Sequence, residues 1–119
     1  MSMNNRYAFR EAVGTVLAFH IIAAGASGAL VSQATGPTQK LLGTSGPDDA
    51  AAGGSVDLCV DDEGMVALGG PVATGDWLTS NGNGKAVATT TAGHQVIGRA
   101  GSDGVDGDVI PYFRGLGQL

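Results

Sequence analysis

Apolar and polar residues alternate along much of the chain with a period close to two, which is typical of half-buried β-strands. In residues 55–60 every second side chain is apolar, so that Val56, Leu58 and Val60 fall on one face. Residues 61–64, Asp-Asp-Glu-Gly, supply a turn, and the apolar segment 65–68 follows. We therefore expect a β-hairpin over residues 55–68.

Two further strand pairs are predicted in the second half of the chain. Residues 77–79 and 85–89 flank an Asn-Gly-Asn-Gly turn, in which both residue types tolerate positive φ. Residues 94–100 and 109–113 flank a segment rich in Gly and Asp. Because Pro111 has no N–H to donate to a ladder, we expect the last strand to lie at an edge or a bulge.

The first half of the chain has fewer clear signals. Strands are expected at residues 15–22 and 29–33, with a weaker signal at 40–42, and residues 47–54 read as a loop. Residues 1–11 lack a clear period and are predicted to form an arm, in which residues 7–12 have the composition of one helical turn. The sequence predicts an all-β fold: a small β-barrel or sandwich of about seven short strands, with an N-terminal arm (residues 1–11) and one β domain (residues 12–119).

The composition limits the core of this domain. The chain has 119 residues, which is the length of one domain, and 21 of them are glycine. It has three Phe, two Tyr and one Trp, so the core must be mainly aliphatic. We expect the large aromatic residues Trp77, Tyr112 and Phe113 to lie in the core or at a subunit interface.

The charge distribution excludes several classes of partner. The formal net charge is −5, which argues against a protein that neutralises many nucleic-acid phosphates. The uncharged stretch over residues 12–31 contains Gly, Thr, Ser and His, and it is too polar for a membrane span. Arg6 and Arg10 before this stretch, with Ala-Gly-Ala at residues 24–26, leave a cleaved secretion signal open as an alternative.

Catalytic and metal-binding motifs are hard to find. Cys59 is the one cysteine, and the two histidines, His20 and His94, stand beside no recognisable nucleophile or acid. The acidic residues near 61–63 and 103–108 are candidate calcium ligands, but their spacing is not that of an EF-hand, and carboxylates commonly cap turn amides. We predict a protein that is not an enzyme and that uses no cofactor or metal.

The order of short motifs between residues 25 and 113 resembles the head decoration, or capsid cement, proteins of tailed bacteriophages. The matching pieces, in chain order, are Gly28-Ala29-Leu30-Val31, Gly54-x-Val56-x-Leu58, Asp62-Glu63-Gly64, Val72-Ala73-Thr74-Gly75-Asp76-Trp77-Leu78-Thr79, Gly84-Lys85-Ala86, Val96-Ile97-Gly98-Arg99-Ala100 and Gly107-Asp108-x-Ile110. In place of the short opening that is typical of the family, this chain has an alanine-rich segment at residues 12–26.

This resemblance implies a compact β domain that forms homotrimers on the outer surface of the virion capsid and stabilises it by contacting the major capsid protein. Residues 1–47 carry a formal charge of +2 and residues 48–119 carry −7. We therefore expect the basic, aromatic segment with Arg6, Tyr7, Phe9 and Arg10 to contact the capsid while the acidic body faces solvent. The alternative is a secreted or fibre-borne carbohydrate-binding module, with Trp77 and residues 81–84 as its contact surface.

Overall fold

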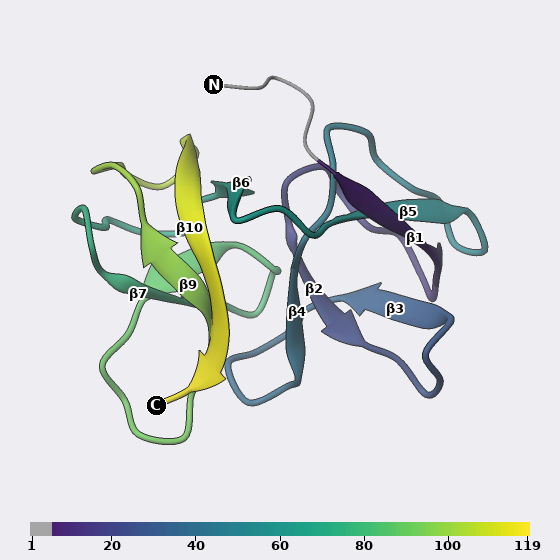
Figure 1. Cartoon of the computed structure of the whole chain (residues 1–119), viewed down its shortest axis with the longest axis horizontal. Helices are drawn as coiled ribbons and strands as arrows, with labels where there is room; N and C mark the ends of the chain where they lie inside the picture. Colours follow the sequence, from purple (N-terminus) through teal and green to yellow (C-terminus); the bar gives the residue numbers. More distant parts are fainter. Residues whose placement is uncertain (1–5) are drawn as a thin grey trace.

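The computed structural model describes residues 6–119 and contains ten β-strands in two sheets (Figure 1). The strands are β1 (Tyr7–Ala12), β2 (Ile21–Ala24), β3 (Leu30–Gln33), β4 (Leu41–Thr44), β5 (Ser55–Cys59), β6 (Glu63–Ala67), β7 (Trp77–Ser80), β8 (Ala86–Ala88), β9 (Gln95–Ala100) and β10 (Val109–Gln118). The predicted all-β class is confirmed, and the two sheets make a sandwich. The described residues contain no helix that is long and apolar enough to cross a membrane.

The first sheet has the strand order β4-β2-β3-β1-β5 and occupies the right-hand side of Figure 1. β1 runs parallel to β3 and antiparallel to β5, so it is an inner strand. The sheet is strongly curled: its two edge strands approach each other at a bridge between Ser45 and Leu58. The inner face of the curl encloses a small apolar cluster of its own.

The second sheet has the order β6-β10-β9-β7-β8, and all of its pairs are antiparallel. The pairing of β7 with β8 confirms the hairpin predicted around the Asn-Gly-Asn-Gly turn. The pairing of β9 with β10 confirms the last predicted pair. In both cases the turn residues lie within the connection itself, so the sequence specified the pairing locally.

The hairpin predicted over residues 55–68 is wrong, although both of its strands exist. β5 pairs with β1 in the first sheet, and β6 pairs with β10 in the second. The intervening residues cross between the sheets: the Asp61 carboxylate accepts hydrogen bonds from Arg6, and the Asp62 carbonyl accepts one from the Arg114 N–H. Alternation identified the strands, but their partners depend on contacts distant in sequence.

Pro111 lies in an inner strand, not at the predicted edge or bulge. It pairs with Met65 of β6, and the one irregularity of β10 occurs between Arg114 and Gly117. The Pro111 carbonyl accepts a hydrogen bond from Gly101 (N···O 2.9 Å), which lies just beyond the end of β9. The N–H and C=O of one residue point to the same side of an antiparallel strand. The N–H that Pro111 lacks would therefore point past the end of β9, so its absence removes no hydrogen bond from the β9–β10 ladder.

The N-terminal segment also differs from the prediction. Residues 7–12 form the inner strand β1, not an arm or a helical turn, and residues 1–5 lie outside the described part of the chain. The strand expected at residues 15–22 begins only at Ile21, whereas residues 29–33 and 40–42 correspond closely to β3 and β4. β1 was missed because its aromatic side chains face outward and its inward positions are Ala and Arg.

Two apolar clusters hold the fold together, and β2 contributes to both. Ile21 belongs to the cluster between the sheets and Ile22 to the cluster inside the curled sheet, and both are fully buried. Tyr112 is the largest fully buried side chain. Apart from this tyrosine the clusters are aliphatic, as the composition predicts, and β2 is covered on both faces.

Candidate functional site

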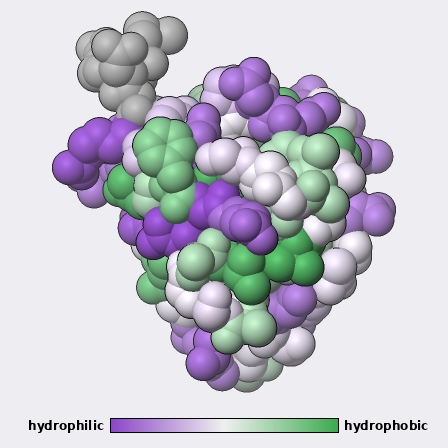
Figure 2. Space-filling model, turned by 90° about the vertical axis from the view of Figure 1, so that its right-hand side faces the viewer, coloured by the Kyte–Doolittle hydropathy of each residue, from purple (hydrophilic) through white to green (hydrophobic). Residues whose placement is uncertain are grey.

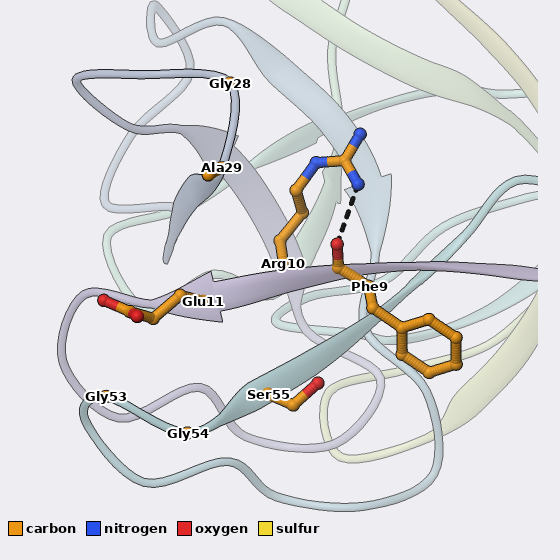
Figure 3. Close-up of a pocket in the computed structure, with 8 residues that line it drawn as sticks. All are labelled: Phe9, Arg10, Glu11, Gly28, Ala29, Gly53, Gly54 and Ser55. Atoms are coloured by element: carbon orange, nitrogen blue, oxygen red, sulfur yellow. Dashed lines mark hydrogen bonds between the residues drawn. The ribbon is translucent and has the colours of Figure 1, made fainter.

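The predicted contact residues Arg6, Tyr7, Phe9 and Arg10 all lie on or directly before β1, but the strand separates them onto two faces. Successive strand residues point to opposite sides, so Phe9 and Glu11 share the outer face. Ala8 packs toward the cluster inside the curl, and Arg10 projects to that side. Figure 3 shows the Phe9 and Arg10 side chains leaving the strand in opposite directions.

The outer face of β1 borders an open hollow of about 650 Å³. Glycine-rich segments form its rim on both sides of the strand (Figure 3), and the lining residues are Phe9, Arg10, Glu11, Gly28, Ala29, Gly53, Gly54 and Ser55. The Phe9 side chain is 68% exposed at this rim. Figure 2, in which the right-hand side of Figure 1 faces the viewer, shows hydrophobic side chains next to hydrophilic ones on that side of the molecule.

Arg6 is already paired within the chain. Its Nε donates to Asp61 Oδ1 at 2.8 Å, and its backbone N–H donates to Asp61 Oδ2 at 2.6 Å. These hydrogen bonds lower the pKa of Asp61 and raise that of Arg6. The positive charge of the N-terminal segment is therefore partly neutralised by Asp61. Phe9 is the apolar side chain that this segment exposes.

A second surface runs across the outer face of the second sheet. The strand register aligns Glu63, Phe113, Arg99 and Trp77 in one row over β6, β10, β9 and β7. The Arg99 guanidinium lies 4.0 Å from the centroid of the Trp77 ring, and its Nη1 donates to the Gly75 carbonyl at 3.0 Å. These contacts hold Arg99 against a half-buried Trp77, which fixes the two side chains as a unit.

Apolar side chains continue this row along β10 and β6. Phe113 is 57% exposed and Val109 is 42% exposed, and the half-buried Pro111 and Met65 lie between them. We refer to Met65, Val109, Pro111 and Phe113, together with Trp77 and Arg99, as the outer β10 surface. Exposed aromatic and aliphatic residues on one rigid sheet face are characteristic of an interaction surface.

Tyr112 points the other way, into the core between the sheets. It is fully buried, and its hydroxyl lies 2.9 Å from Thr44 Oγ1 on β4. Of the three aromatic residues predicted for the core or an interface, Tyr112 is thus a core residue, Phe113 is exposed, and Trp77 is half-buried.

The acidic residues cap turns, as predicted from their composition. Asp76 accepts the N–H of Ala73, and Asp108 accepts that of Val105. Asp103 accepts both the N–H and the hydroxyl of Thr74, at 2.8 and 3.0 Å, and these hydrogen bonds lower its pKa. In the part of the chain that the structure describes, no three His, Cys, Asp or Glu side chains are grouped in a way that would hold a metal ion.

The residues considered for catalysis are occupied by structural contacts. Nδ1 of the buried His20 lies 2.8 Å from the Ala18 carbonyl oxygen, and Nδ1 of His94 lies 2.7 Å from Thr89 Oγ1. Cys59 is buried in β5. The partners in these hydrogen bonds are a backbone carbonyl for His20 and a threonine hydroxyl for His94.

The two parts of the surface suggested for a carbohydrate lie at opposite ends of β7. Trp77 begins β7 and Asn81 follows its end, so about four residues, or about 13 Å, separate them. The loop also packs against the first sheet: the Gly84 carbonyl accepts the Ile21 N–H at 2.7 Å, and the Asn83 carbonyl accepts Gln33 Nε2 at 3.1 Å. The loop at residues 81–84 is thus held against the first sheet, whereas Trp77 lies against Arg99 on the second.

Arg99 and Met65 are residues of the outer β10 surface that the sequence does not identify. Arg99 was noticed only as part of a motif, and its place beside Trp77 depends on the pairing of β7 with β9. Met65 was assigned to a hairpin that does not form. The alternation of Val109, Pro111 and Phe113 with the buried Ile110 and Tyr112 is the one signal in the sequence that identifies the outer β10 surface.

Comparison with known proteins identifies the fold. No protein-family model matches the chain, and no curated protein matches it. Among solved structures, the chain is similar to the head fiber gp8.5 N base in bacteriophage phi29, with a TM-score of 0.74 and 19% sequence identity. The likeness covers 95% of this chain and 96% of that chain, so the two share the β-sandwich over their whole length.

Proposed function

We propose that this protein is a structural component of a bacteriophage head, a decoration protein that binds the outer surface of the capsid and stabilises it. The observation that carries the proposal is the likeness to a phage head fiber base over 95% of the chain. The succession of motifs that resembles capsid cement proteins supports it independently. On this proposal the protein acts without catalysis or a cofactor, through the surfaces it joins.

The outer face of β1 is the proposed contact with the major capsid protein. Phe9 projects from a rigid strand beside an open hollow, so a partner side chain gains apolar contact without ordering a loop. Removing residues 1–11 is an unsuitable test, because it deletes an inner strand of the first sheet. A single substitution on the outer face avoids this problem.

The test is co-sedimentation of purified protein with empty capsid shells. Phe9→Ser is expected to reduce the bound fraction strongly and to leave the fold intact, because the side chain is exposed. Val105→Ser is the matched control, since Val105 is a similarly exposed apolar residue on the second half of the chain. Equal binding by both variants and the wild type would refute the β1 contact; no binding by wild type would refute the capsid assignment.

The outer β10 surface is the proposed self-association surface of a homotrimer. Phe113, Val109 and Pro111 lie on one sheet face, so copies can bury them without rearrangement. Light scattering on wild type is expected to give the mass of three chains, and Phe113→Glu to give that of one chain. A wild-type monomer, or a Phe113→Glu trimer, would contradict this assignment.

A second candidate function is the base of a head fibre, which is favoured by the similarity to the head fiber base of bacteriophage phi29. A base anchors a further protein and need not strengthen the shell. Thermal disruption of shells with and without bound protein separates the two functions. A raised disruption temperature supports decoration, whereas an unchanged temperature with full binding supports a fibre base.

A further inference from the structure

A second cavity, of about 390 Å³, lies where the inner side of the curled first sheet meets β10. Its walls are mainly apolar. The apolar side chains come from all five strands of the first sheet and from the residue after β5: Ala8, Ala24, Leu30, Leu42, Leu58 and Val60. The two edge strands of this sheet are joined by a bridge between Ser45 and Leu58, and Leu58 also lines the cavity.

Two arginines, Arg10 of β1 and Arg114 of β10, line the same cavity. Their described hydrogen bonds go to backbone carbonyls only: Arg10 Nη1 donates to Phe9 at 2.8 Å, and Arg114 Nη2 donates to Leu42 at 3.3 Å. The one ion pair among the described residues joins Arg6 to Asp61, and none of the residues lining the cavity has a carboxylate. Each guanidinium thus keeps donors without an anionic partner.

Arg114 also carries a donor that has no acceptor in the described part of the chain. Its Nε is buried and has no hydrogen-bond partner among the described residues. A buried donor of a charged group that has lost water without gaining an acceptor is costly, and such donors are uncommon in folded proteins. An anion entering the cavity would compensate two like charges that now line one small space.

We propose that this cavity is a docking site for an acidic, extended peptide segment of a partner protein. Arg10 and Arg114 hold a Glu or Asp carboxylate of the peptide. The apolar side chains of the neighbouring peptide residues pack on Leu30, Leu42 and Leu58. Charge complementarity selects the carboxylate, and the aliphatic walls select a peptide over a free ion. The overall charge of −5 repels an acidic peptide, so binding requires this local positive site. This peptide site does not depend on the capsid assignment, because its ligand is defined only by a carboxylate with apolar neighbours.

The test is an amide-shift NMR titration of the full chain with the blocked peptide acetyl-Leu-Glu-Leu-amide, and with its Gln counterpart as the matched ligand. We expect the Glu peptide to shift the amides of Ala8, Leu30 and Leu42 at concentrations up to about 5 mM. The Gln peptide is expected to bind at least about tenfold more weakly, since a hydrogen bond between two charged groups is stronger than one to a neutral amide.

Variants locate the charge that the peptide requires. Arg10→Gln is expected to weaken binding of the Glu peptide about tenfold. Lys85→Gln removes one positive charge just before β8, at a residue that does not line the cavity, and is expected to leave binding unchanged. Equal binding of the two peptides, equal shifts from inorganic phosphate, or equal loss in both variants would overturn the proposal. If Arg10→Gln fails to fold, comparing the binding of the two peptides to the wild type still tests the proposed peptide site. Co-sedimentation with shells tests the capsid assignment separately.

Discussion

The hydroxyl groups of Thr44 and Tyr112 lie 2.9 Å apart in the core and join β4 of the first sheet to β10 of the second. Both side chains are fully buried, so neither hydroxyl has water as an alternative partner. Tyr112→Phe leaves the Thr44 hydroxyl unpaired and is expected to lower the free energy of unfolding by about 1–2 kcal/mol. Chemical denaturation measures this loss, and the double variant with Thr44→Val should recover part of it.

The same tyrosine predicts a loss of stability at high pH. Burial raises the pKa of Tyr112 to about 12, with the Thr44 hydrogen bond opposing the shift, while the unfolded chain has a tyrosine pKa near 10. The stabilisation is therefore complete below about pH 10 and declines between about pH 10 and 12, by about 2–3 kcal/mol in all.

Denaturation at stepped alkaline pH measures this decline. Tyr112→Phe should lack the corresponding step, and Tyr7→Phe, which alters the half-buried tyrosine of β1, should retain it. An unchanged pH dependence in Tyr112→Phe would contradict the assignment of the step to this residue.

The local parts of the fold were predictable from the sequence, and the non-local parts were not. The turn at residues 81–84 specifies the β7–β8 hairpin through its own Asn and Gly residues. The turn at residues 61–64 looks equally suitable, yet β5 and β6 separate because each pairs with a strand more than 40 residues away. Which strand pairs with which depends on how the neighbouring strands bury each other's side chains. The alternation of apolar and polar residues within one strand does not encode this.

The candidate surfaces follow the same division. Phe9 and Arg10 were singled out together by composition, and only the strand β1 shows that their side chains lie on opposite faces. Trp77 and Phe113 were predicted together, and Arg99 between them follows from the register of three strands. The cavity with Arg10 and Arg114 joins residues 104 positions apart and left no signal in the sequence.

Gly98 of β9 is predicted to be the least replaceable glycine of the second sheet. Its φ is +146°, and a Cβ at this position would overlap the carbonyl oxygen of Phe113 on β10. Gly98→Ala is therefore expected to cost about 3–5 kcal/mol. Gly93 also has a positive φ, of +91°, but nothing lies within 4 Å of a Cβ there, so Gly93→Ala should cost about 1 kcal/mol. Similar losses in both variants, measured by thermal denaturation, would contradict this comparison.

The hydrogen bonds of Asp103 predict a contribution to acid sensitivity. The N–H and hydroxyl of Thr74 stabilise the carboxylate and lower the pKa of Asp103 below its ordinary value of 3.8. The stability it contributes is present above that ordinary value and is lost as the pH falls through the lowered pKa. Asp103→Asn should make the acid limb of a stability profile shallower, and Asp106→Asn in the same loop is the control. Identical acid limbs in wild type and Asp103→Asn would refute the prediction.

Deletion of residues 1–11 is predicted to unfold the first sheet. The deletion removes most of β1, which pairs with β5 over five residues and with β3 on its other side, and it uncovers the cluster around Val56 and Leu58. Ladder hydrogen bonds and core packing are lost together, and the cost is expected to exceed the few kcal/mol by which a domain of this size is typically stable. Circular dichroism and amide dispersion in NMR measure the result, with Phe9→Ser as the folded control because its side chain is exposed. A deletion variant that keeps the dispersed spectrum of the wild type would show that the segment is a dispensable arm after all.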